Sequence, residues 1–152
     1  MLTELISEKE ITVKVEASDW EDAIRKSAQA LLDNGAIEDR YITGMIQTVK
    51  ELGPYIVIAP AVAIAHARPE CGVLRTDISL ATLKTPICFG HAGNDPVSLV
   101  ITLAARDSDE HLDALADLAE LLSDSVRFQA ILKADTPEQI YNILSKNTGE
   151  GI

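Results

Sequence analysis

VSLVITLAA, residues 97–105, is the stretch that decides the fold. It is apolar enough for a strand buried on both faces, which is typical of a strand at the centre of a sheet with helices on each side. Strand-like and helix-like segments alternate along the rest of the chain. We therefore expect an α/β fold, with a central mixed sheet flanked by helices on both faces and a single domain over residues 1–152.

Further strands are expected before the central one. ITVKV at residues 11–15 alternates apolar and polar side chains with the two-residue period of a half-buried strand. YIVIAPAVAIAHA at residues 55–67 is apolar, but Pro60 cannot donate a hydrogen bond within a central strand, so two short extended pieces are predicted. Residues 74–83 are another strand candidate.

Two helices are expected near the N-terminus. The first follows Ser18, because Ser18 and Glu21 have the spacing of a capping box, and Gly35 lies where this helix should stop. The second covers about residues 38–52, where an apolar stripe repeats at helical intervals until residues 53–54, Gly-Pro, break it.

Two more helices are expected after the central strand. Residues 107–109 supply capping oxygens for a helix with His111 in its first turn. Its core-facing residues are expected to be Leu112, Leu115, Ala119 and Leu122. Thr136, Pro137 and Gln139 have the cap, first-turn proline and capping-box partner that predict the last helix.

Composition bounds the class of protein. With 152 residues, of which 47% are hydrophobic, the chain can bury the core of one domain, and only residues 147–152 are expected to form a frayed tail. The net charge of −11 opposes binding to nucleic acid, because a phosphate backbone needs a basic patch. The absence of a long apolar run and of a basic, apolar N-terminal segment predicts a cytoplasmic protein. Cys71 and Cys88 form no CxxC pair, and we assign them no chemistry.

Histidines are the candidates for chemistry. The sequence holds three of them, His66, His91 and His111, each at the edge of an expected element. His66 ends an extended segment, and His111 lies at a helix start, where free N–H groups and the helix dipole favour an anion. Because strand ends in an α/β sheet gather side chains from distant parts of the chain, we expect His66 and His111 to meet.

A neutral imidazole is a competent phosphoryl acceptor, since one ring nitrogen keeps its lone pair. Transfer depends on positioning and on stabilisation of charge, for which His111 and Arg68 are the available groups around His66. Two alternatives stay open: a three-histidine metal site, although no HxH or HExxH spacing supports it, and a hydrolase with acid/base histidines, although no GxSxG motif is present. No P-loop exists, so the donor is expected to be a protein and not ATP.

Three stretches, in this order and spacing, together resemble the IIA family of the mannitol, fructose and ascorbate phosphotransferase systems. They are VAIAHAR at residues 62–68, NDPV at residues 94–97 leading into the central strand, and DEHL at residues 109–112. The resemblance extends over nearly the whole chain and implies one IIA type 2 domain over residues 1–152. It implies no metal and no organic cofactor.

The resemblance also implies roles and partners. His66 is expected to take phosphate from the phosphorylated histidine carrier protein and to pass it to a cysteine of the cognate IIB component, which links the chain indirectly to a membrane permease, IIC. His111 is expected to stabilise the transferring group. Residues 53–60, GPYIVIAP, look more like ascorbate-type members and point to L-ascorbate uptake, with a mannitol- or fructose-type sugar as the alternative.

One departure concerns the charge around the phosphoryl group. The resemblance leads us to expect an arginine late in the second helix, but residues 45–50, MIQTVK, contain none. Arg68 is the phosphate-binding candidate in its place, unless it is a surface arginine that pairs with Glu70 or Asp77. His91 either lines the same cleft or, as we prefer, lies exposed in a loop. A different functional class also stays open, in which the phosphohistidine is a signal to a transcription regulator.

Overall fold

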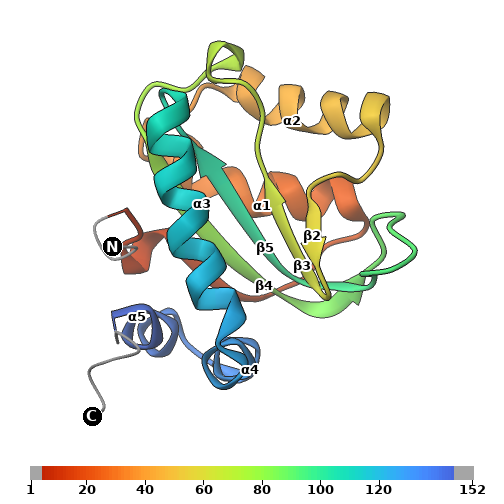
Figure 1. Ribbon diagram of the computed structural model, residues 1–152, viewed down its shortest axis with the longest axis vertical. Helices are drawn as coiled ribbons and strands as arrows, with labels where there is room; N and C mark the ends of the chain where they lie inside the picture. The colour runs from red at the N-terminus through yellow and green to blue at the C-terminus, as the bar shows by residue number, and fades with distance from the viewer. Residues whose placement is uncertain (1–4, 146–152) are drawn as a thin grey trace.

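Residues 97–104 form β5, the third of five strands in one mixed sheet (Figure 1). The computed structural model describes residues 5–145. In sheet order the strands are β1 (Ile11–Val15), β4 (Asp77–Ile87), β5 (Val97–Ala104), β3 (Val62–Ala65) and β2 (Val57–Ala59). β1 is parallel to β4 and β3 is parallel to β5, whereas the β4–β5 and β2–β3 pairs are antiparallel.

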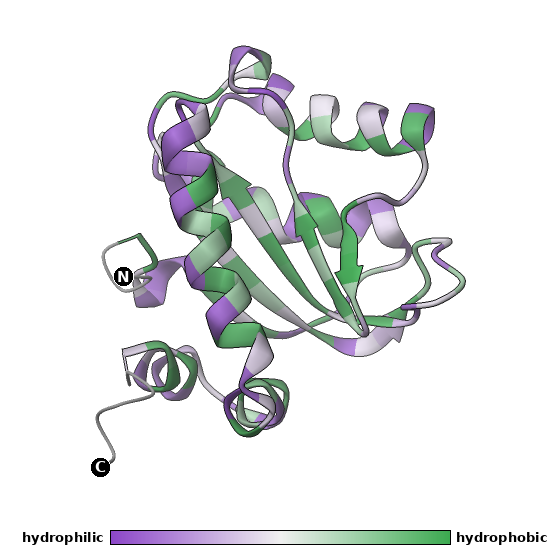
Figure 2. Cartoon of the chain, viewed as in Figure 1, coloured by the Kyte–Doolittle hydropathy of each residue, from purple (hydrophilic) through white to green (hydrophobic). Residues whose placement is uncertain are grey.

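Helices cover both faces of this sheet. They are α1 (Trp20–Asp33), α2 (Asp39–Leu52), α3 (Ser108–Ser123), α4 (Ser125–Lys133) and α5 (Pro137–Ser145), with short 3₁₀ turns η2 (Glu8–Glu10) and η3 (Pro69–Cys71). One apolar cluster joins α1 and α2 to one face of the sheet, and a second joins α3, α4 and α5 to the other. Figure 2 shows that the strands between them are hydrophobic along most of their length. The predicted α/β class, with helices on both faces, is confirmed.

The strand predictions hold with one shift. Every residue of β5 except Ser98 is buried, as expected of a central strand. Residues 55–67 form the two predicted short pieces, β2 and β3, joined by a turn in which Ala61 has φ +71°. The candidate at residues 74–83 instead begins at Asp77 and continues to Ile87.

The predicted first cap is wrong by one residue. The side chain of Asp19, not Ser18, accepts the backbone N–H of Asp22 at 2.8 Å, because the helix begins at Trp20. The predicted stop is confirmed, since Gly35 follows the helix with φ +81°. At the last helix, Gln139 accepts the N–H of Thr136 at 3.3 Å and donates its own N–H to the Thr136 hydroxyl at 3.2 Å, so that capping box is present.

The predicted core-facing stripe of α3 is wrong in register. Leu112 is 63% exposed and Ala119 is exposed, while Leu115 and Leu122 are only partly buried. The fully buried side chains are those of Ala114, Leu118 and Leu121. Leu112 lies about 160° around the helix from Ala114, so both cannot face the sheet. The short helix α4 was not predicted, and the expected tail at residues 147–152 lies outside the described residues.

Candidate functional site

The sheet topology brings His66 and His111 together. β3 and β5 are parallel neighbours, so their carboxyl ends lie at the same edge of the sheet. His66 is the first residue after β3, and the chain leaving β5 enters α3 at Ser108, with His111 in the first turn. The two imidazole rings lie with their centroids 5.3 Å apart and their planes tilted by 56°. The structure therefore places these two histidines side by side, as expected.

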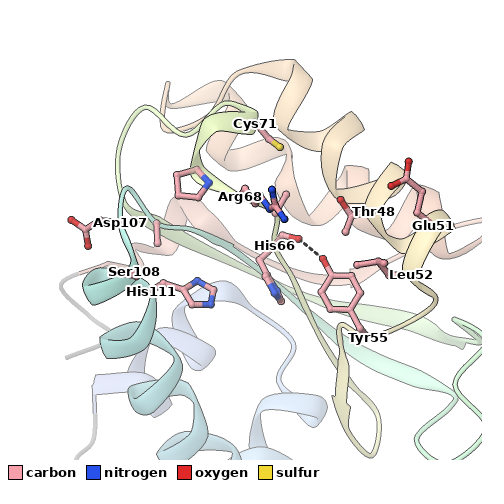
Figure 3. Close-up of a pocket in the computed structure, with 13 residues that line it drawn as sticks. Thr48, Glu51, Leu52, Tyr55, His66, Arg68, Cys71, Asp107, Ser108 and His111 are labelled. Atoms are coloured by element: carbon pink, nitrogen blue, oxygen red, sulfur yellow. Dashed lines mark hydrogen bonds between the residues drawn. The ribbon is translucent and has the colours of Figure 1, made fainter.

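Both rings line a pocket of about 670 Å³. Its walls come from α2, the segment that follows β3, and the start of α3 (Figure 3). The polar and titratable residues in these walls are Thr48, Glu51, Tyr55, His66, Arg68, Cys71, Asp107, Ser108 and His111. The lining of the pocket thus includes two histidines and one arginine.

A backbone contact fixes the tautomer of His66. Its Nδ1 lies 2.9 Å from the carbonyl oxygen of Ile64. A carbonyl oxygen only accepts hydrogen bonds, so Nδ1 must carry the ring proton. In the neutral ring, Nε2 is then the nitrogen with a free lone pair, which is the form a nucleophile needs.

His111 and the start of α3 form the opposite wall. Burial, and to a smaller extent the charge of His66, lower the pKa of His111, which favours the neutral form of its ring. Asp107 caps the helix, because its carboxylate accepts the N–H of Glu110 at 2.8 Å. The positive end of the α3 dipole therefore lies at the pocket, where Ser108 is part of the lining.

Arg68 lies on the pocket wall with an exposed side chain. Within residues 5–145 it forms no ion pair, and the alternative partner Asp77 is bound by Arg75 at 3.1 Å. The guanidinium is thus available to an anion in the pocket. Among the described residues that line this pocket, it is the one arginine.

The end of α2, where the resemblance leads us to expect an arginine, contributes no arginine to the lining of this pocket. Thr48, late in α2, lines the pocket, and its hydroxyl donates to the carbonyl oxygen of Gly44 at 2.8 Å. Glu51 and Leu52 follow on the same wall (Figure 3). A neutral hydroxyl, already satisfied within the helix, thus occupies the part of α2 where the resemblance leads us to expect a charge.

Sequence reasoning missed two tyrosines. The hydroxyl of Tyr55 donates to the carbonyl oxygen of His66 at 3.0 Å, and its ring meets the imidazole edge-on at 5.3 Å (Figure 3). Tyr41, predicted as part of the core stripe of its helix, is fully buried, yet its hydroxyl accepts the N–H of Ala67 at 3.0 Å and donates to the carbonyl oxygen of Leu103 at 2.8 Å. For Tyr41 the sequence did offer a signal, because a tyrosine predicted in the core stripe of a helix needs a hydrogen-bond partner for its buried hydroxyl.

His91 lies apart from the other two histidines. It belongs to the loop before β5, where its Nδ1 accepts the N–H of Asn94 at 3.0 Å, and it is not among the pocket-lining residues. In the described part of the chain no three His, Cys, Asp or Glu side chains are arranged to hold a metal ion. The three-histidine metal alternative therefore finds no geometry in residues 5–145.

Comparison with known proteins identifies the family. Residues 4–147 match the family described as phosphoenolpyruvate-dependent sugar phosphotransferase system, EIIA 2. The chain belongs to this family. The resemblance based on residues 62–68, 94–97 and 109–112 is thereby confirmed. Across the described residues, none of the helices of this EIIA chain is both long and apolar enough to span a membrane.

Two relatives and one solved structure show which members of the family this EIIA chain is similar to. The mannitol-specific cryptic phosphotransferase enzyme IIA component of Escherichia coli (strain K12) is 39% identical over 95% of this chain and 98% of its own length. The ascorbate-specific PTS system EIIA component of the same strain is 34% identical over 93% of each chain. The solved complex of enzyme IIAMTL and phosphorylated enzyme IIBMTL from Escherichia coli shares the fold, with a TM-score of 0.82 at 23% identity over 92% of this chain and 96% of that chain.

Proposed function

We propose that this EIIA chain is a cytoplasmic phosphoryl carrier that accepts a phosphoryl group on Nε2 of His66 from the phosphorylated histidine carrier protein and passes it to a cysteine of a IIB partner. The observation that carries the proposal is the 2.9 Å contact between His66 Nδ1 and the Ile64 carbonyl oxygen. It leaves the lone pair on Nε2 of a ring that lines an open pocket beside His111.

The first transfer needs no proton movement. The lone pair of His66 Nε2 forms a bond to phosphorus while the phosphorus–nitrogen bond of the donor phosphohistidine breaks. The bonding pair stays on the donor nitrogen, and the donor ring, which carries a proton on its other nitrogen, leaves as a neutral imidazole. His66 keeps its hydrogen on Nδ1, and the ring gains positive charge. The Ile64 carbonyl oxygen, already the acceptor for Nδ1–H, stabilises that charge.

The residues around His66 suit the stabilisation of a phosphoryl group during transfer. The neutral ring of His111 donates an N–H to a phosphoryl oxygen, and it gains a proton more easily once the negative group has arrived. Arg68 offers a guanidinium without an ion-pair partner in the described chain. The dipole of α3 adds to both, and such preorganised charge is the main catalytic resource in phosphoryl transfer.

The second transfer reverses the first. A IIB thiolate attacks phosphorus, the bond to His66 Nε2 breaks, and the electron pair returns to the ring nitrogen. The likeness in fold to a IIA protein solved with its phosphorylated IIB supports such a partner. The exposed side chain of Leu52 on the pocket wall suits a brief, modest interface, which a relay requires because each partner must leave.

The identity of the transported sugar depends on the IIB partner, because the carrier passes phosphate to a protein and need not bind the sugar. L-ascorbate is our assignment, on the resemblance of residues 53–60 to ascorbate-type members and on the ascorbate-specific relative. The mannitol-specific relative is more similar in overall identity, so a mannitol-type IIB is the competing partner. The permease IIC is reached only through IIB.

The test is discharge of the purified phosphoprotein onto isolated IIB domains. The radiolabelled protein is mixed with an ascorbate-type IIB or a mannitol-type IIB, each with its acceptor cysteine intact or replaced by serine. Faster transfer to the ascorbate-type cysteine supports the full proposal. Faster transfer to the mannitol-type cysteine supports the carrier role but changes the assigned sugar to a mannitol type. Transfer to neither cysteine contradicts the carrier role.

A further inference from the structure

Two tyrosine hydroxyls hold the two ends of one peptide bond next to His66. The carbonyl oxygen of His66 accepts the hydroxyl of Tyr55 at 3.0 Å (Figure 3). The N–H of Ala67, which belongs to the same peptide unit, donates to the hydroxyl oxygen of Tyr41 at 3.0 Å. Burial raises the pKa of both tyrosines, that of Tyr41 to about 12, so both hydroxyls keep their protons at neutral pH.

This peptide lies where the strand pairing ends. The ladder between β3 and β5 has its last pair at Ala65 and Thr102, so the segment after Ala65 has no strand partner to fix it. Tyr41 takes over this role, since its hydroxyl also donates to the carbonyl oxygen of Leu103 at 2.8 Å and so joins the two diverging chains. Tyr41 is fully buried in the core, whereas Tyr55 is 37% exposed at the pocket.

The position of the backbone on each side of the His66 Cα atom decides where the imidazole points. β3 fixes the backbone before His66, and the two hydroxyls fix the peptide after it, so the direction of the Cα–Cβ bond is determined from both sides. Only then does Nδ1 reach back to the carbonyl oxygen of Ile64 at 2.9 Å. Displacement of the chain after His66 would move the carbonyl carbon of His66, and with it the Cα–Cβ direction, and so would disturb the contact that favours a proton on Nδ1.

We propose that Tyr41 and Tyr55 are positioning residues that clamp the His66–Ala67 peptide and thereby hold His66 in the tautomer and orientation that present Nε2 to the phosphoryl donor. This inference rests on the proposed function. Neither hydroxyl takes part in the chemistry, because each acts through the backbone of His66 and not on the phosphoryl group.

Tyr55→Phe is the decisive variant. It keeps the ring that meets the imidazole edge-on and removes only the hydroxyl that binds the His66 carbonyl. Tyr41→Phe is the companion, and thermal unfolding shows whether it still folds, since it leaves buried partners unsatisfied. Tyr141→Phe is the matched control, because Tyr141 lies in α5 and packs in the apolar cluster on the other face of the sheet from Tyr41.

The experiment measures the tautomer and the transfer separately. Ring-nitrogen NMR of nitrogen-15 histidine-labelled protein at about pH 8, where imidazoles are neutral, reports which nitrogen of His66 carries the proton. Steady-state transfer from the phosphorylated histidine carrier gives the maximal rate and KM. Tyr55→Phe is expected to populate the Nε2–H tautomer and to lower the maximal rate about five- to tenfold with unchanged KM, and folded Tyr41→Phe to do the same, while Tyr141→Phe matches the wild type.

A wild-type tautomer ratio or a wild-type maximal rate in Tyr55→Phe overturns the clamp, whatever Tyr41→Phe does. Slower transfer with an unchanged tautomer ratio would mean that the hydroxyl acts other than through the orientation of His66. A wild-type protein that accepts no phosphate on His66 defeats the proposed function itself, and this result is distinct because the tautomer is measured without any phosphoryl transfer.

Discussion

The imidazole of His111 lies 5.3 Å from that of His66, centroid to centroid, at the shared carboxyl edge of β3 and β5. His66 comes from the strand end and His111 from the first turn of the helix that follows the neighbouring strand. The parallel pairing of the two strands is what creates this juxtaposition. A phosphoryl group on His66, as proposed, would therefore lie near a second imidazole and a helix N-terminus.

His111→Ala is expected to slow phosphoryl transfer about 10²- to 10³-fold, the usual effect of removing one preorganised charge-stabilising donor. The protein should still fold, because His111 is only half-buried and lies outside both apolar clusters. Rapid-quench measurement of transfer, with thermal unfolding beside it, checks both points. His91→Ala is the control, and equal transfer rates for the two variants would remove His111 from the site.

Arg68→Gln is expected to slow transfer about tenfold, because an exposed guanidinium contributes less than a buried one. Arg68→Lys should recover part of the rate, since it restores the charge without the planar fork. The matched control is Arg25→Gln, an exposed arginine of α1 away from the pocket. A wild-type rate in Arg68→Gln, measured in the same transfer assay, would make Arg68 a surface residue only.

Thr48→Arg introduces a charge on the α2 wall of the pocket, where the resemblance leads us to expect one. In the Arg68→Gln background this change should raise the transfer rate severalfold, since either arginine can reach an anion in the same pocket. Thr48→Gln in the same background, similar in length but uncharged, should not. An Arg and a Gln variant with the same rate would show that α2 cannot supply the charge.

A buried carboxylate pair predicts a pH-dependent stability. Glu10 and Asp77 are both buried and share the side-chain amide of Asn34, which donates to Glu10 at 2.9 Å and to Asp77 at 3.2 Å. Burial, and then the neighbouring Asp77, raise the pKa of Glu10 to about 7 from 4.5. The folded state thus binds a proton that the unfolded state has already lost, and the stability this provides is complete below pH 4.5 and is lost as the pH rises to about 7.

Glu10→Gln is the variant that tests this pair. It removes the titrating group, so its free energy of unfolding should fall less than that of the wild type between about pH 4.5 and pH 7. Urea unfolding at a series of pH values measures the two slopes. Parallel curves for the variant and the wild type would mean that Glu10 does not titrate in this range.

Patterns that depend on local chemistry were predictable from the sequence. The buried run of residues 97–105, the break at Gly53 and the cap at Thr136 each depend on neighbours in the chain, and each predicted the observed element. The core-facing side of α3, which tertiary packing decides, was not. α3 offers apolar residues on more than one face, and only the sheet selects Ala114 over Leu112.

For the site, the sequence predicted which histidines meet but not how His66 is held. His66 and His111 were placed together by the rule that strand ends gather distant side chains, and their distance agrees with it. The contacts of Tyr41 and Tyr55 to the backbone around His66 connect the second helix and its following loop to a strand end. Such contacts depend on packing between layers, which no local pattern encodes.

Mapping of the phosphorylation site tests the central claim most directly. The purified protein and its His66→Ala variant are incubated with phosphoenolpyruvate, enzyme I and the histidine carrier protein, and the acid-labile phosphate is located by mass spectrometry under alkaline conditions. We expect one phosphoryl group on His66 in the wild type and none in a His66→Ala variant that remains folded. Phosphate on another residue, or none on the wild type while the relay proteins are active, would contradict the account.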